Sequence, residues 1–199
     1  VSLVGTAVVV LTGQTEAFVV SDGTTNADNT ITGGSGNDTL TSNNASDNDT
    51  FVYASTAALN GEDVITKFTA GATDKDILDV GAFLGTTDVT TGGVAGVAID
   101  ASAGTAITTV TAGANITGTD MADQAFVWGG TLATLGTAMV GASADDVIYL
   151  ANGAKAFVLI GTMADGPVTY DAYFITGTNT AAAGTETITL VGTVAVLDG

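Results

Sequence analysis

Residues 33–41 read GGSGNDTLT, and this stretch carries the strongest structural signal in the chain. It matches the nonapeptide G-G-x-G-x-D-x-U-x, in which U is a large apolar residue, at every fixed position. The glycines allow a tight turn that presents backbone carbonyls to a metal. Asp38 supplies a carboxylate oxygen, and Leu40 points inward from a short strand. Calcium prefers several oxygen ligands in a flexible shell, so the stretch predicts one turn of a calcium-binding coil.

One such turn cannot complete a site, because the ligands come from adjacent turns. Residues 24–32 (TTNADNTIT) place Asn29 at the aspartate position and lack the glycines, and residues 44–52 (NASDNDTFV) place Asp49 there after a two-residue shift of frame. Three turns predict one or two calcium ions, with an ordinary polar loop as the alternative. The predicted metal-binding residues are Asp38, Asp49, Gly33, Gly34, Gly36, Asn29, Asp28 and Asp47, with Asp22 as a further oxygen donor in reach.

The charge balance also favours a divalent cation. The chain has 21 acidic residues against three lysines, Lys67, Lys75 and Lys155, and a net charge of -18. Phosphate binding needs a basic surface, so this balance excludes nucleic acid as a partner and argues against anionic membranes. Because cysteine is absent, disulfides cannot staple the fold, and metal is the natural substitute outside the cell.

No catalytic grouping is evident. The absence of histidine and cysteine excludes Ser-His and Cys-His nucleophiles and an ordinary zinc site. The pairs Asp145–Asp146 and Asp120/Asp123 could form a glycosidase dyad, and Trp128 could stack on sugar, but turn caps and a core aromatic are the simpler interpretations. We therefore expect a protein that is not an enzyme.

The remaining sequence predicts an all-β fold with at most one or two short helices. A helix is expected at residues 132–140, and Asn152-Gly153 between two apolar runs predicts a hairpin. Strands are expected at residues 1–11, 16–21, 51–53, 63–68, 76–80, 94–99, 106–111, 146–151, 154–160, 168–175 and 186–191. The predicted architecture is a short calcium-binding parallel β-roll joined to an antiparallel β-sandwich or meander. The expected division places N-terminal strands and calcium-binding repeats at 1–53 and a β-rich assembly and secretion region at 54–199.

Residues 24–80 resemble the end of RTX proteins exported by type I secretion. The resemblance rests on the nonapeptide, on DTFVY at 49–53, on DVITKF at 63–68 and on DKDIL at 74–78. It implies that Asp63 also binds calcium, and that the acidic, apolar C-terminal region is an uncleaved secretion signal. Lys67 stands where the family usually has aspartate. The implied mechanism keeps the repeats unfolded at low cytosolic calcium and folds them outside the cell.

No leader with a basic start opens the sequence, and no apolar run is long enough to span a bilayer as a helix. We expect an extracellular or cell-surface protein that forms a homo-oligomer or polymer, as a surface layer or filament, with a cell-surface polysaccharide as a candidate ligand. Two alternatives stay open: a C-terminal secretion and folding module of a larger RTX enzyme, and an adhesin module.

Overall fold

The chain folds mainly into β-strands, which confirms the predicted all-β class. The computed structural model describes residues 1–23, 26–43, 46–69, 76–85, 108–110, 119–120, 124–129, 131–139, 148–150, 153–161, 168–177 and 186–197. The strands are β1 (Val8–Val10), β2 (Val19–Ser21), β3 (Thr30–Thr32), β4 (Thr39–Thr41), β5 (Thr50–Val52), β6 (Asp63–Thr69), β7 (Ile77–Asp79), β8 (Thr108–Val110), β9 (Thr119–Asp120), β10 (Gln124–Trp128), β11 (Ile148–Tyr149), β12 (Lys155–Ile160), β13 (Val168–Thr176) and β14 (Thr187–Leu197). The helices are a 3-10 turn η1 (Ala57–Leu59), α1 (Gly81–Leu84) and α2 (Leu132–Met139).

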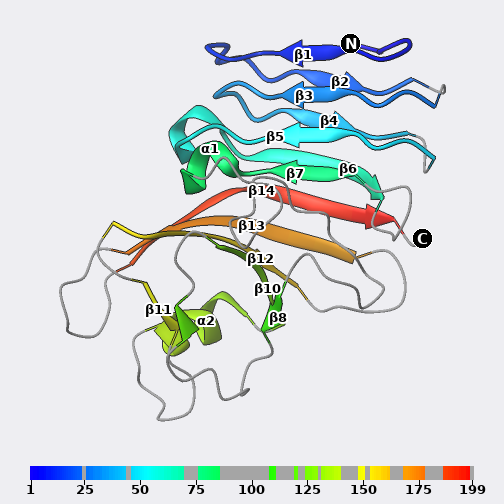
Figure 1. Ribbon diagram of the computed structural model, residues 1–199. Coiled ribbons are helices and arrows are strands. Elements are labelled where there is room, and N and C mark those ends of the chain that lie inside the picture. Colours follow the sequence, from blue (N-terminus) through cyan, green and yellow to red (C-terminus); the bar gives the residue numbers. More distant parts are fainter. Residues whose placement is uncertain are drawn as a thin grey trace.

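The first seven strands wind as a coil between two sheets (Figure 1). β1, β3, β5 and β7 form one parallel sheet, while β2, β4 and β6 lie side by side in the other. Successive strands therefore alternate between the sheets, and each coil lies on the one before it. Each of β3, β4 and β5 buries its central apolar residue, Ile31, Leu40 or Phe51, in one shared core between the sheets.

Residues 1–21 pair within the chain, but less regularly than predicted. β1 and β2 lie in different sheets, and residues 1–7 contribute only an isolated parallel bridge between Ser2 and Ser21. Leu3 is buried and closes the N-terminal end of the core. A strand over all of 1–11 does not form, because only Val8–Val10 has a partner strand in register.

The C-terminal half extends one of the two sheets. β14 pairs in parallel with β6, and the complete sheet has the order β2-β4-β6-β14-β13-β12-β10-β8. β12, β13 and β14 form the predicted antiparallel meander. Phe157 and Leu159 of β12 join the core of the coil, whereas Val158 and Ile160 join a second core beneath α2. One sheet and one core therefore continue across residue 53, the expected boundary between the two regions of the chain.

The strands on either side of Asn152-Gly153 were predicted to pair as a hairpin, but β11 and β12 do not pair with each other, and Asn152 itself lies outside the described residues. β11 pairs in parallel with β9, whereas β12 pairs with β10 on one side and with β13 on the other. Both edges of β12 are occupied, so no edge is left for β11. The local turn signal is overridden by the burial of β12 in the middle of the large sheet.

The helix prediction is confirmed, since α2 spans Leu132–Met139. The strand expected at 94–99 lies outside the described residues, and the one expected at 106–111 is represented by β8. In the part of the chain that the structure describes, no helix has the length and apolar character needed to cross a membrane.

Candidate metal centre

The turns of the coil gather at its two ends, because the strands of each sheet run parallel. The turns that follow β2 and β4 lie at one end. The turns that follow β1, β3 and β5 lie at the other. This arrangement divides the nine predicted metal-binding residues into two groups.

Three aspartates meet where the turn after β2 lies on the turn after β4. Asp22 leaves β2, and Asp47 and Asp49 precede β5. One carboxylate oxygen from each lies within 4.8 Å of the others, and all three side chains are buried. Among the described residues, four of their oxygens, Asp22 Oδ2, both oxygens of Asp47 and Asp49 Oδ2, have no hydrogen-bond partner. Buried carboxylates without partners are rare, and they fit a site that a cation completes.

The electrostatics of this trio are unfavourable in the absence of a cation. Burial, followed by the charges of Asp49 and Asp22, raises the pKa of Asp47 to about 6. Burial also raises the pKa of Asp49, against the lowering effect of a hydrogen bond from the backbone of Asn29. A divalent cation would reverse both effects, because it favours the ionised carboxylates.

Two other predicted ligands lie beside the trio without joining it. Asn29 Nδ2 donates to Asp22 Oδ1 at 2.7 Å, and Asn29 Oδ1 accepts from Ala7 N at 2.8 Å. Asn29 therefore orients the carboxylates rather than offering a free oxygen. Asp28 is exposed, and its Oδ1 accepts from Asn48 N at 2.9 Å.

The complete nonapeptide lies at the opposite end of the coil. Asp38 accepts from Phe18 N at 2.7 Å and from Gly34 N at 3.0 Å, so both of its oxygens already have partners. Asp63 Oδ1 accepts from Asp38 N at 2.9 Å. Burial, and then the charge of Asp38, raise the pKa of Asp63 to about 7. Asp38 and Asp63 are thus two adjacent acids at a site with fewer free oxygens than the trio.

The glycines of the nonapeptide let successive turns approach closely. A Cβ atom on Gly34 would overlap the carbonyl oxygen of Gln14, and one on Gly36 would overlap that of Glu16. A Cβ atom on Gly33 would lie 2.6 Å from Asp63 Oδ2 and 3.1 Å from Asp38 Oδ2. Gly34 and Gly36 have room only for glycine, because the backbone of the preceding turn occupies the space of a side chain, whereas at Gly33 the neighbouring atoms belong to two aspartate side chains.

A ladder of Asx side chains runs along the coil, and sequence analysis missed its last member, Asp76. Each Asx residue precedes or begins a strand, and its oxygen accepts the N–H of the equivalent residue one coil earlier. In one sheet these bonds run from Ala7 N to Asn29, from Asn29 N to Asp49 and from Asp49 N to Asp76, and in the other from Phe18 N to Asp38 and from Asp38 N to Asp63. The recurring triplet Asx-x-apolar (NTI, DTL, DTF, DVI and DIL) is the signal that could have identified Asp76.

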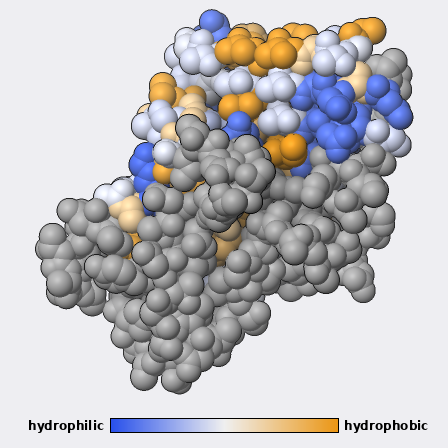
Figure 2. All heavy atoms as spheres, in the orientation of Figure 1, coloured by the Kyte–Doolittle hydropathy of each residue, from blue (hydrophilic) through white to orange (hydrophobic). Residues whose placement is uncertain are grey.

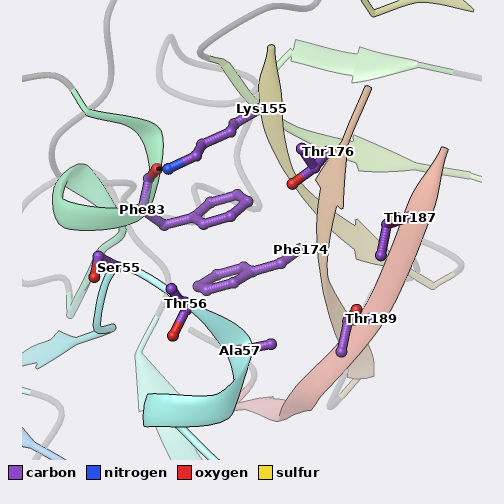
Figure 3. Close-up of a pocket in the computed structure, with 9 residues that line it drawn as sticks. All are labelled: Ser55, Thr56, Ala57, Phe83, Lys155, Phe174, Thr176, Thr187 and Thr189. Atoms are coloured by element: carbon purple, nitrogen blue, oxygen red, sulfur yellow. Dashed lines mark hydrogen bonds between the residues drawn. The ribbon is translucent and has the colours of Figure 1, made fainter. Parts of the chain in front are cut away.

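A separate cavity lies between η1, α1 and the C-terminal sheet (Figure 3). The rings of Phe83 and Phe174 stack at 3.7 Å, and Lys155 Nζ donates to Phe83 O at 2.7 Å. The remaining lining is mostly hydroxyl groups: Ser55, Thr56, Thr176, Thr187 and Thr189. The cavity volume is about 200 Å³, below the roughly 300–1,000 Å³ of small-molecule sites. The lysine ties α1 to β12, and we assign no ligand to this cavity.

No family model, curated protein or solved structure matches this chain.

Proposed function

We propose that this protein is a secreted calcium-binding structural protein, which folds on calcium and self-assembles at the cell surface as a surface layer or extracellular filament. The observation that carries the proposal is the buried trio Asp22, Asp47 and Asp49, four of whose carboxylate oxygens have no hydrogen-bond partner in the described part of the chain. The proposal includes the finer description of the fold, in which the two-sheeted coil is a calcium-binding β-roll of the RTX type.

The donor set of the trio suits calcium better than other common metals. All the free atoms are oxygens, and calcium takes about six to eight oxygen ligands in a flexible arrangement. Zinc sites are built mainly from cysteine sulfur and histidine nitrogen, with carboxylates as additional ligands, and this chain has neither cysteine nor histidine. Backbone carbonyls and water would supply the remaining ligands.

A cation at this position would couple binding to folding. Asp22 belongs to one coil and Asp47 and Asp49 to the next, so the three carboxylates converge only when the coils are stacked. The unfolded chain has no such cluster, and the free energy of calcium binding then becomes free energy of folding. The net charge of -18 opposes folding when calcium is absent, which supports export of an unfolded chain.

The first test is a calcium titration of the calcium-free chain, followed by circular dichroism and light scattering together. We expect a gain of β signal with a parallel rise in scattering. A gain of β signal without scattering would keep the calcium site and favour the alternative of a secretion and folding module. No change in either signal would refute the RTX interpretation.

The variant Asp47→Asn tests the assignment of the trio. Removal of one anionic ligand should raise the half-saturating calcium concentration by about tenfold or more, which corresponds to ~1.4 kcal/mol. The matched control is Asp171→Asn, which removes one charge from an exposed position on β13. Equal calcium affinities for the two variants would show that the trio does not bind calcium.

A further inference from the structure

β1 presents an open strand edge at the N-terminal end of the coil. Among the described residues only β3 pairs with it. Ala7 O accepts from Thr30 N, and Leu11 N donates to Thr32 O. Alternate residues of a strand direct their backbone groups to opposite sides, so Val8 and Val10 direct their N–H and C=O groups toward the open edge.

The side chains at this edge are apolar and exposed. Val8 is 72% exposed and Val10 is 61% exposed, whereas the equivalent outward positions of β3 hold Thr30 and Thr32. Val1, Val4 and Val19 add to the same end of the molecule, and Figure 2 shows hydrophobic surface there. Natural edge strands are usually guarded by lysine, proline or a bulge, and β1 has none of these.

The charge distribution allows two such ends to approach one another. Residues 1–21 contain a single charged side chain, Glu16, in a protein of net charge -18. Two copies that met anywhere along the aspartate-rich turns would repel strongly, whereas two copies that met at the β1 edge would not.

The backbone of β1 is self-complementary about Val9. In an antiparallel pair with a two-fold axis at Val9, Val8 of one copy lies opposite Val10 of the other. Both residues have outward-facing N–H and C=O groups, so each of the two symmetric pairs exchanges two hydrogen bonds and no outward group of β1 is left free. In this arrangement the side chains of Val8 and Val10 form cross-strand pairs, and residues 1–4 of the two copies lie close to one another.

We propose that a second copy of this chain docks on the β1 edge, antiparallel and in this register, to form a two-fold symmetric dimer in which the two coils are stacked end to end. The inference rests on the self-assembly in the proposed function and names its first contact. None of the trio's carboxylates lies on β1, so the dimer depends on calcium only as far as folding of the coil does. A closed, isologous interface of this kind would make the dimer a building unit rather than a filament by itself.

The test is the mass of the folded protein in solution, measured by light scattering after size exclusion, with and without calcium. The wild type should show twice the 19.4 kDa of the chain. Val8→Lys/Val10→Lys should be monomeric, because each lysine faces a lysine of the other copy. Val8→Lys/Val10→Glu should restore the dimer, because each lysine then faces a glutamate. The control Leu59→Lys/Leu132→Lys adds two charges at exposed positions far along the chain and should remain dimeric.

A wild type that is folded by circular dichroism but monomeric would overturn the inference, and so would a Lys/Lys variant that still dimerises. Failure of the Lys/Glu variant to recover the dimer would exclude the proposed register. These outcomes are independent of the calcium titration. A dimer without a calcium response would contradict the proposed function alone, and a calcium response without a dimer would contradict this inference alone.

Discussion

Several buried carboxylates in this protein accept hydrogen bonds from backbone N–H groups, independently of any ligand. Asp63 begins β6 and accepts the N–H of Asp38, and the buried Asp76 accepts the N–H groups of Asp49 and Thr69. Burial raises the pKa of Asp76 to about 7, against the lowering effect of these bonds. The pKa of Asp63 is also raised to about 7, first by burial and second by the charge of Asp38. The ladder therefore contains acids that are more easily protonated than in the unfolded chain.

The stability of the calcium-free chain should fall as pH rises. Between the ordinary pKa of 3.8 and the folded value of about 7, the folded chain keeps a proton on Asp63 that the unfolded chain has lost. The unfolded state then binds fewer protons, so the free energy of unfolding decreases with pH across this window. For Asp63 the decrease from pH 4 to pH 8 is on the order of 3 kcal/mol.

Asp63→Asn should flatten this dependence, because an amide keeps an acceptor for Asp38 N but cannot ionise. Urea unfolding of both proteins in calcium-free buffer, from pH 4 up to the highest pH at which the chain is still folded, measures the two slopes. Asp171→Asn, at an exposed position, should keep the wild-type slope. Identical slopes for Asp63→Asn and the wild type would show that Asp63 has an ordinary pKa in the folded chain.

At the scale of the element, each coil strand is too short to be stable alone. β1 to β5 have three residues each, and every one is held by its neighbours in the sheet and by an Asx oxygen at its start. The coil is therefore quasi-one-dimensional, and its terminal unit has the fewest contacts. Local defects should loosen the end of the coil before they affect the centre.

Asn29→Ala should loosen the first coil selectively. It removes the acceptor of Ala7 N and the donor to Asp22 Oδ1, which should cost about 1–3 kcal/mol because buried groups lose their partners. We expect faster hydrogen exchange at residues 7–11, with β12 to β14 unchanged. Asn37→Ala is the matched control, since Asn37 also accepts a backbone N–H, from Glu62, but is exposed to water that can replace it. Uniformly faster exchange over the whole chain would contradict a local effect.

At the scale of the whole molecule, the coil and the C-terminal sheet meet where β14 lies on β6 (Figure 1). Gly192 of β14 has a φ of 142°, and a Cβ atom there would overlap the carbonyl oxygen of Asp63. Gly192 also pairs with Ala172 of β13. This glycine thus allows a single strand to join two parts of the fold that are far apart in sequence.

Gly192→Ala should weaken the junction by about 2–4 kcal/mol, through backbone overlap and an unfavourable φ. Because the two halves share one sheet across this contact, calorimetry should show the single unfolding transition broaden or separate into two. The control is Gly153→Ala. Gly153 also has a positive φ, of 81°, but no atom lies within 4 Å of an added Cβ. This substitution should lower the free energy of unfolding by only about 1–2 kcal/mol and keep a single transition. A single sharp transition in Gly192→Ala would show that the two halves are coupled through contacts other than the one at Gly192.

The sequence by itself determined the features that depend on neighbouring residues. The nonapeptide and its two imperfect repeats predicted short strands that each bury one apolar residue, as Leu40 and Phe51 do. The helix α2 and the strands of the C-terminal meander were also predictable, because periodicity and turn composition are local properties of the chain. Asp47 and Asp49 could be named as candidate ligands for the same reason.

Only the tertiary structure decided which segments lie on one another. It separated Asp38 and Asp63 from Asp47 and Asp49, placed Asp22 with the latter pair, and gave β12 the partners β10 and β13 in place of β11. Among the described residues, it also left the outer edge of β1 without a partner strand. These outcomes depend on the stacking of turns and the burial of strand edges between residues that are about twenty or more positions apart, and no local pattern specifies contacts of that kind.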